Sequence, residues 1–285
     1  MSAPSYASRS YAQDLLPPAI AGLLSVIVNY GGTFILVFQA ARVAGLDAAQ
    51  TASWVWSVSV GVGLTGLALS WRYRAPIITA WSTPGAAFLV TALGSVSYPE
   101  AIGAYMLSAL GFVILGLSGY FDRLIRLIPP AIAAALLAGI LLQFGIGAFG
   151  GASADPVLVG LLTGSYLILK RFTARYAIVG ILLIGLGWLL LRGEVDLSGL
   201  SLKLASPVLT LPVFSLNAAL SLALPLFLIT LTGQYMPGML VLRNDGYTTS
   251  ANPIVTVTGL GALIMAPFGS HAFNVAAITA AIVTG

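Results

Sequence analysis

Long apolar runs, each without a charged residue, follow one another along almost the whole sequence. Runs of about 17 to 25 apolar residues can cross the hydrocarbon core of a bilayer as helices. All 20 charged residues, 12 basic and 8 acidic, lie between these runs or at their edges. The pattern predicts an all-α, polytopic membrane protein. The ten expected spans are 15–38, 49–70, 76–97, 101–120, 129–149, 156–170, 176–192, 216–242, 252–264 and 265–285.

The composition agrees with this prediction and excludes other classes. Apolar residues make up 59% of the chain and charged residues only 7%, whereas a soluble domain carries about 25% charged residues. Cysteine is absent, which rules out disulfides, thiolate metal sites and cysteine nucleophiles. We expect no metal and no cofactor. The net charge of +4 comes from basic residues scattered singly between the apolar runs. This distribution is typical of loops that set the orientation of a membrane protein, not of a nucleic-acid-binding surface.

The basic residues between the spans predict the orientation of the chain. With the N-terminus inside, nine basic residues fall on the inner side and three, Arg42, Arg192 and Lys203, on the outer side. The positive-inside rule therefore places the 1–14 segment in the cytoplasm. The first apolar run is too long for a signal peptide and lacks a cleavage pattern, so it is expected to remain as the first span.

The third span is predicted to be interrupted inside the membrane. Its first part, Ala75 to Trp81, favours an extended backbone and leads into Ser82-Thr83-Pro84. Thr83 is a good N-cap and Pro84 suits the first helical position, so a half-helix should begin here. The extended part must be buried in protein or line a cavity, because lipid cannot satisfy its backbone.

The tenth span is expected to repeat this plan of an extended segment and a half-helix. Within 263–274, an apolar stretch meets an interruption at Pro267 and Gly269, and Ser270 is expected to cap a helix that runs through 276–278. An alignment without gaps pairs Trp81 with Phe268, Thr83 with Ser270, and Pro84 with His271.

A second internal match supports the repeat. Residues 28–34 of the first span match 229–235 of the eighth, which places Gly32 on Gly233. The copies lie seven spans apart, an odd number, so they are expected to cross the membrane in opposite directions. Inverted repeats with interrupted helices are typical of transporters that bind substrate near the bilayer midplane. The alternative is that Pro and Gly only kink ordinary packed spans.

Two facing half-helix N-termini would favour an anion, because free N–H groups and two positive dipole ends point at it. Aromatic residues on the repeat elements suit a flat apolar ligand, although lipid contact or packing is the alternative for each of them. These residues are Tyr30, Phe34, Trp81, Tyr235 and Phe268. The amides of Asn29, Gln234 and Asn274 lie deep in spans, where they need a partner in the substrate or in neighbouring backbone.

His271 is the only histidine of the chain. A dry site at a helix N-terminus favours the neutral imidazole, whereas a bound carboxylate favours the protonated one, so proton and anion binding would assist each other. His271 is therefore a candidate proton-coupling residue. A neutral imidazole that only donates a hydrogen bond is the alternative, and the residue pattern leaves both roles open.

Three motifs resemble the benzoate-proton symporter (BenE) family of bacteria: 78–87 (ITAWSTPGAA), 232–238 (TGQYMPG) and 267–278 (PFGSHAFNVAAI). The resemblance implies import of benzoate with a proton across the bacterial inner membrane. It also implies a fold similar to that of the uracil and sulfate transporters, with fourteen spans in two inverted groups of seven. Spans one to four and eight to eleven would form a core domain, and the others a gate.

This fold divides the chain into core residues 15–120, gate residues 121–200 and core residues 201–285. Span 11 and gate spans 12 to 14 would then lie beyond Gly285, so the chain is expected to be truncated. A homodimer is one assembly to consider. The expected substrate-binding residues are Tyr30, Ser82, Thr83, Pro84, Gln234, Tyr235, Phe268, Gly269, Ser270, His271 and Asn274.

Other functions remain open at this point. A carrier for another anion or for a nucleobase could use the same fold. A truncated, non-transporting membrane fragment is a second alternative. An intramembrane enzyme is disfavoured, because one histidine, no cysteine and no acidic residue within the expected spans leave few catalytic groups.

Overall fold

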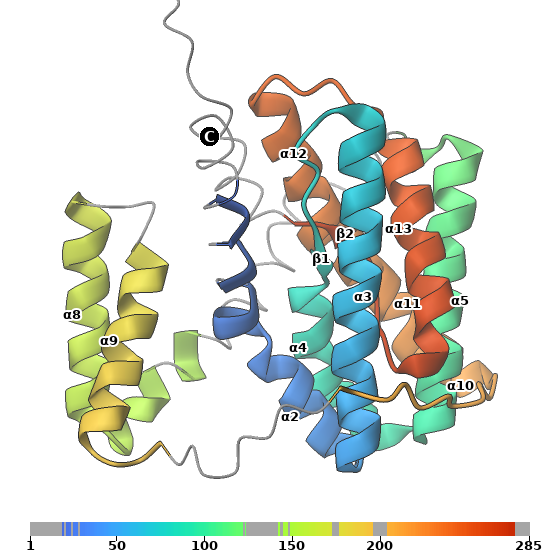
Figure 1. Ribbon diagram of the computed structural model, residues 1–285. Coiled ribbons are helices and arrows are strands. Elements are labelled where there is room, and N and C mark those ends of the chain that lie inside the picture. Colours follow the sequence, from blue (N-terminus) through green and yellow to red (C-terminus); the bar gives the residue numbers. More distant parts are fainter. Residues whose placement is uncertain are drawn as a thin grey trace, which may run out of the picture.

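The computed structural model describes residues 29–121, 149–172, 177–195 and 204–276, together with single positions and short pieces within 19–27 and 123–147. In this part of the chain all regular secondary structure is helical apart from one two-stranded sheet, and 204–215 is an irregular connecting segment (Figure 1). The longer elements are α2 (Ile35–Val43), α3 (Ala48–Tyr73), β1 (Thr79–Trp81), α4 (Thr83–Ala92), α5 (Tyr98–Ser118), α8 (Pro156–Phe172), α9 (Ala177–Leu191), α11 (Leu224–Thr230), α12 (Met236–Asn244), α13 (Ala251–Met265) and β2 (Phe273–Val275).

Shorter helical turns link these elements. Three are π-helical, namely η1 (Asn29–Thr33), η5 (Ala219–Ala223) and η6 (Leu231–Tyr235). The others are α10 (Leu216–Ala218) and the 3₁₀ turns η2 (Leu93–Ser95), η3 (Gly151–Ser153) and η7 (Ala266–Phe268). Both η1 and η6 contain a glycine of the second internal match, Gly32 and Gly233 respectively. The two matched segments thus share the same departure from α-helical geometry.

Five helices of the described chain are long and apolar enough to cross a membrane: Ala21–Val43, Ala48–Tyr73, Tyr98–Ser118, Leu216–Arg243 and Ala251–Phe268. They correspond to the expected spans 1, 2, 4, 8 and 9. The expected span 129–149 falls mostly on residues outside the described part of the chain, as do residues 277–285 of the tenth span. Large apolar side chains on the outer faces of these helices, such as Leu67, Trp71 and Leu117, are exposed, as lipid contact requires.

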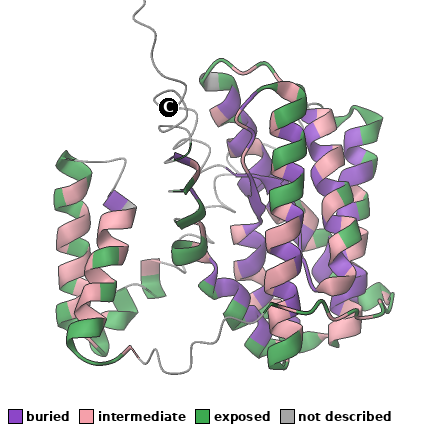
Figure 2. Cartoon of the chain, in the orientation of Figure 1, coloured by how far each residue is buried: buried purple, intermediate pink, exposed green. Residues whose placement is uncertain are grey.

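The buried residues gather among α2 to α5 and α11 to α13 (Figure 2). Helices α5 and α13 pack closely because glycines remove side chains from their contact. A Cβ atom on Gly116 would lie 2.6 Å from the Thr256 backbone nitrogen, and one on Gly259 would lie 3.0 Å from that of Val113. Small residues of this kind allow membrane helices to approach each other closely. The result is a rigid frame around the two strands.

Helices α8 and α9 form a separate antiparallel hairpin in Figure 1. One end of the hairpin is closed by Arg192, which forms ion pairs with Asp155 and, at 2.8 Å, with Glu194. A hydrogen bond from the backbone N–H of Leu158, assisted by Arg192, holds the pKa of the Asp155 carboxyl below its ordinary value. Asp155 and Arg192 therefore lie at the same end of the hairpin.

Candidate functional site

The two interrupted segments meet through β1 and β2. The strands pair antiparallel, with Thr79 opposite Val275 and Trp81 opposite Phe273. Two further backbone hydrogen bonds extend the ladder, from Ser82 N to Ala272 O (3.0 Å) and from Ala276 N to Ile78 O (2.9 Å). The extended backbone expected at 75–81 therefore finds its hydrogen-bond partners in protein, which is what the absence of water in a bilayer demands.

Helix α4 begins directly after β1, inside the buried part of the molecule (Figure 1). The N-cap is Ser82, one residue before the predicted Thr83, which is instead the first helical residue. The Ser82 hydroxyl accepts a hydrogen bond from Gly85 N (3.1 Å) and another from the Thr230 hydroxyl (2.8 Å). Because Ser82 faces Thr230 on α11, the third and eighth spans meet at the first turn of α4.

The prediction for the second interrupted segment is wrong in its register. Ser270 does not cap a helix: the chain continues through η7 and an extended stretch, and β2 begins seven residues later than the alignment with β1 requires. Neither the pairing of Ser270 with Thr83 nor that of His271 with Pro84 holds. The turn is made at Gly269 (φ +106°), where a Cβ atom would lie 2.7 Å from the Tyr98 hydroxyl and 3.0 Å from Trp54 Cβ. A helix through 276–278 would lie almost wholly outside the described residues.

An aromatic cluster of Tyr30, Phe34 and Trp81 lies beside the start of α4. The Trp81 ring is edge-on to Phe34 (4.8 Å between ring centroids) and to Tyr30 (5.1 Å), and the latter two are stacked at 4.9 Å. The Tyr30 hydroxyl donates to Ser59 Oγ at 2.7 Å. Trp81 Nε1 is buried and has no hydrogen-bond partner in the described chain. The end of β1 thus brings together a cluster of aromatic rings and an indole N–H that has no acceptor among the described residues.

His271 is fully buried between α3, α5 and β1. Trp54 Nε1 donates to His271 Nδ1 at 3.2 Å, and the Tyr105 ring lies edge-on to the imidazole at 6.5 Å. The other ring nitrogen, Nε2, is buried without a partner among the described residues. Upstream, the Ser53 and Ser57 hydroxyls donate to the Phe268 carbonyl (2.9 and 3.2 Å), which attaches this loop to α3.

Gln234 and Pro84 also lie at this junction. Gln234 is only 8% exposed and its side chain has no hydrogen bond to the described residues. A Cβ atom on the neighbouring Gly233 would lie 3.1 Å from Pro84 Cγ, so η6 passes close to the first turn of α4. Gln234 therefore keeps its hydrogen-bonding capacity for another partner.

Three predicted site residues serve the architecture of the site. The Tyr235 hydroxyl hydrogen-bonds Thr258 (2.5 Å) and donates to the Phe273 carbonyl (2.9 Å), so it holds β2 in place. The Asn274 amide, oriented to satisfy its neighbours, accepts from Ser82 N and donates to Val275 O. The Phe268 ring packs edge-on against Trp56 at 5.8 Å.

Sequence reasoning missed Trp54, Tyr105 and Thr230. Each lies inside an apolar span, and no local signal distinguishes it from an ordinary packing residue. Their roles follow only from the approach of α3, α5 and α11 to the two strands. Pattern analysis of one span at a time has no means of detecting such contacts.

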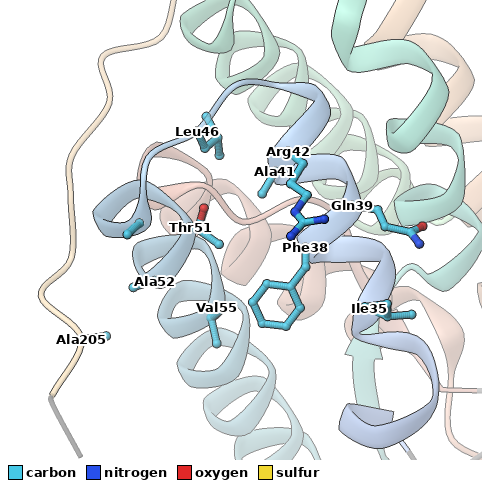
Figure 3. Close-up of a pocket in the computed structure, with 11 residues that line it drawn as sticks. Ile35, Phe38, Gln39, Ala41, Arg42, Leu46, Thr51, Ala52, Val55 and Ala205 are labelled. Atoms are coloured by element: carbon cyan, nitrogen blue, oxygen red, sulfur yellow. The ribbon is translucent and has the colours of Figure 1, made fainter. Parts of the chain in front are cut away.

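A pocket of about 800 Å³ lies elsewhere, between α2 and the first turns of α3 (Figure 3). Phe38, Arg42 and Val55 are among its lining residues, and it contains no predicted site residue. The described chain also contains no group of His, Cys, Asp or Glu that could hold a metal ion. The chemistry available at the strand junction is thus that of neutral donors and aromatic faces.

The fold defines the class of protein. The structure is similar to the transmembrane domain of a cyanobacterium bicarbonate transporter, BicA, with a TM-score of 0.66 over 96% of this chain and 78% of that one. At 15% identity the likeness concerns the fold alone. The chain accordingly shares the mostly helical fold of that transmembrane domain.

The chain belongs to the BenE family, described as benzoate membrane transport protein, which matches residues 13–285. It is 40% identical over 270 residues to the benzoate membrane transport protein of Acinetobacter baylyi, covering 95% of this chain and 68% of that one. It is also 40% identical over 266 residues to the inner membrane protein YdcO of Escherichia coli, covering 93% and 68%. The family resemblance is confirmed, and the chain is a membrane transporter rather than an enzyme.

Proposed function

We propose that this chain forms the substrate-binding part of a carrier that imports benzoate, or a similar aromatic carboxylate, together with a proton. The observation that carries the proposal is the start of α4. There a helix N-terminus lies next to the Tyr30, Phe34 and Trp81 rings, and Trp81 Nε1 is a buried donor that has no partner among the described residues. The aromatic side chains can pack against the ring of the substrate, and the helix N-terminus and the indole N–H can donate hydrogen bonds to its carboxylate.

The energetic terms at this site are of similar size. Burial of one carboxylate at mid-bilayer costs on the order of 3 kcal/mol on insertion scales. A helix dipole returns up to ~2 kcal/mol, and each hydrogen bond to a charged group contributes about 1.5 to 3 kcal/mol. Two or three such interactions offset the cost with a small surplus. Binding is then reversible, as a carrier requires.

The proposal includes the membrane arrangement. The two interrupted segments belong to a pair of inverted seven-span repeats, with spans 1 to 4 and 8 to 10 in a core domain and 5 to 7 in a gate. The protein lies in the bacterial inner membrane with its N-terminus in the cytoplasm, and a homodimer is its proposed assembly. The shared π-helical turns η1 and η6, at segments matched in sequence, support the repeat.

Uptake of labelled benzoate into liposomes that contain the purified protein tests this function. We expect uptake to increase when the outside is acidified relative to the inside. Unlabelled benzoate analogues should compete, whereas uracil, sulfate and bicarbonate should not. Competition by one of these three instead would indicate another anion or nucleobase carrier on the same fold. If no benzoate is taken up, with or without the pH gradient, the chain is a non-transporting fragment.

A matched pair of substitutions at Ser82 tests the position of the carboxylate. Asp and Asn both cap helices about as well as Ser does, and their side chains have the same shape as each other. Ser82→Asp adds a negative charge beside the proposed carboxylate, whereas Ser82→Asn does not. We expect benzoate affinity to be at least ~10-fold lower in the Asp variant than in the Asn variant, since about 1.4 kcal/mol of repulsion has this effect. Equal affinities would place the carboxylate elsewhere.

A further inference from the structure

We propose that Trp54 is a positioning residue that fixes His271 as a neutral hydrogen-bond donor, with Nε2–H presented to the substrate site. The ring then takes up no proton during transport. This inference concerns the site of the proposed function and rests on it for the identity of the ligand and for the coupling of transport to a proton. Its starting point is one hydrogen bond, from Trp54 Nε1 to His271 Nδ1 at 3.2 Å.

The direction of this bond is fixed by chemistry. An indole N–H can only donate, so the nitrogen that faces it must be an acceptor. A neutral imidazole has one protonated and one unprotonated nitrogen. If Nδ1 is the acceptor, the proton of the neutral ring is on Nε2. Trp54 therefore selects one of the two tautomers of His271.

The surroundings leave the ring little freedom to change this arrangement. Trp54 and His271 are fully buried and Tyr105 is 2% exposed. The backbone before His271 is held by the tight turn at Gly269, which packs against the Trp54 main chain and the Tyr98 hydroxyl. Trp54 thus contacts the loop through its backbone and the imidazole through its side chain.

The free nitrogen points to a ligand. His271 Nε2 is buried and has no hydrogen-bond partner in the described chain. The backbone of Ser82, the N-cap of α4, is in weak hydrogen-bonding reach of the ring, but Nε2 has no partner of normal hydrogen-bond geometry among the described residues. A buried donor without an acceptor destabilises the empty site. A carboxylate oxygen at the start of α4 would satisfy Nε2–H.

The same contacts oppose protonation of the ring. A second proton would have to be added to Nδ1, where it would face the Trp54 N–H and turn a hydrogen bond into a donor–donor contact. The titratable side chains packed around this loop in the described residues are the phenols of Tyr105 and, beside Gly269, Tyr98. Both are uncharged near neutral pH and cannot compensate an imidazolium. The proton that accompanies the substrate must therefore use another carrier group.

The sole histidine makes a direct test feasible. The protein is labelled with ¹⁵N-histidine in lipid, and the two ring nitrogens are observed by NMR between pH 5 and pH 8. We expect one protonated nitrogen, assigned to Nε2, and one unprotonated nitrogen, with shifts that do not change over this range. Protonated Nδ1, or a ring that titrates in this range, would overturn the proposal.

Two variants on α3 separate positioning from simple packing. Trp54→Phe keeps an aromatic ring but removes the donor, so the His271 spectrum should show both tautomers and benzoate affinity should fall about 3- to 10-fold, the range of about 0.7 to 1.4 kcal/mol. Trp56→Phe is the matched control, because its ring packs on Phe268 rather than on His271. Its spectrum should be that of the unsubstituted protein. An unchanged spectrum in Trp54→Phe would contradict the positioning role.

Transport provides an independent measurement. In His271→Gln, an amide N–H can replace Nε2–H, and we expect uptake to remain stimulated by an inward proton gradient at lower affinity. Loss of this stimulation, with benzoate exchange across the membrane retained, would identify His271 as the proton carrier and overturn the proposal. The proposed function fails separately, if the unsubstituted protein does not bind benzoate, because the NMR spectrum reports the ring state without any ligand.

Discussion

The two interrupted crossings, 75–92 and 266–276, each contribute one of the two paired strands but acquire their structure in different ways. In the first, β1 passes directly into α4 through Ser82 and Pro84, which are ordinary helix-start residues. In the second, side chains from other helices hold the backbone: Tyr235 hydrogen-bonds β2 itself, and Trp54 hydrogen-bonds His271 just before the strand. Local chain chemistry thus specifies the first crossing, and long-range contacts specify the second.

This difference predicts an order of sensitivity. Substitutions that break contacts to β2 should disturb the site more than substitutions at the helix start of the first crossing. Each test compares thermal unfolding of a variant and its control in the same detergent or lipid.

The largest effect is expected for Gly61→Ala on α3. A Cβ atom there would lie 2.3 Å from the ring of Phe273, which is fully buried and is also enclosed by Gly261. Overpacking of this kind costs about 1 to 3 kcal/mol, and the absence of free space places the cost at the upper end. Gly63→Ala on the same helix has nothing within 4 Å and should be neutral or slightly stabilising. Equal melting temperatures for both variants would contradict the packing of β2.

Tyr235→Phe should have the next largest effect. It removes the hydroxyl that donates to the Phe273 carbonyl and leaves the Thr258 hydroxyl without this partner. An unsatisfied buried polar group costs about 1 to 3 kcal/mol. Tyr120→Phe is the control, because this side chain is exposed. A loss no greater than that of the control would mean that β2 does not depend on Tyr235.

Ser82→Ala should be milder. The substitution removes the cap of α4 and the acceptor of the Thr230 hydroxyl, which can rotate to bond a backbone carbonyl of its own helix instead, and it should cost about 1 kcal/mol. Ser250→Ala removes a residue that also precedes a helix, α13, but whose side chain makes no capping hydrogen bond. The control should therefore unfold at the temperature of the unsubstituted protein. A Ser82→Ala effect larger than that of Gly61→Ala would reverse the comparison of the two crossings.

The smallest effect is expected for Gly233→Ala. The new methyl group would lie 3.1 Å from Pro84 Cγ, which a shift of a few tenths of an ångström can relieve. We expect a loss below about 1 kcal/mol, together with weaker benzoate binding because η6 would move from α4. Gly32→Ala, at the matched position of the first span, has nothing within 4 Å and serves as control. If the Gly233→Ala variant binds benzoate more weakly than the Gly32→Ala variant but unfolds at the same temperature, the contact between η6 and α4 affects substrate binding and not stability.

Much of the fold could be predicted from the sequence. Apolar length identified five crossings that the structure confirms as long apolar helices, and the Ser82-Thr83-Pro84 signal located the start of α4 within one residue. These features depend on local chemistry, which a sequence displays directly. The segments matched between the first and eighth spans contain the π-helical turns η1 and η6, but that match did not predict the contact between the third and eighth spans.

The second crossing could not be predicted in the same way. Ser270 follows Pro267 and Gly269 and looks like an N-cap, yet the chain remains extended because Tyr235 binds the Phe273 carbonyl and β1 offers a free strand edge. The Trp54 partner of His271 was missed for the same reason, since it lies 217 positions away along the chain. Contacts of this range are absent from local patterns.

The pairing of β1 with β2 also has a consequence for biosynthesis. Thr79 must wait for Val275, 196 positions later, before its strand has a partner. At about 5 to 20 residues per second, a ribosome needs roughly 10 to 40 s to supply that partner. During this interval β1 cannot enter the lipid, because its backbone N–H and C=O groups have no hydrogen-bond partners there. The insertion machinery, or water inside the partly assembled helix bundle, must therefore hydrogen-bond the backbone of β1 until β2 has been synthesised.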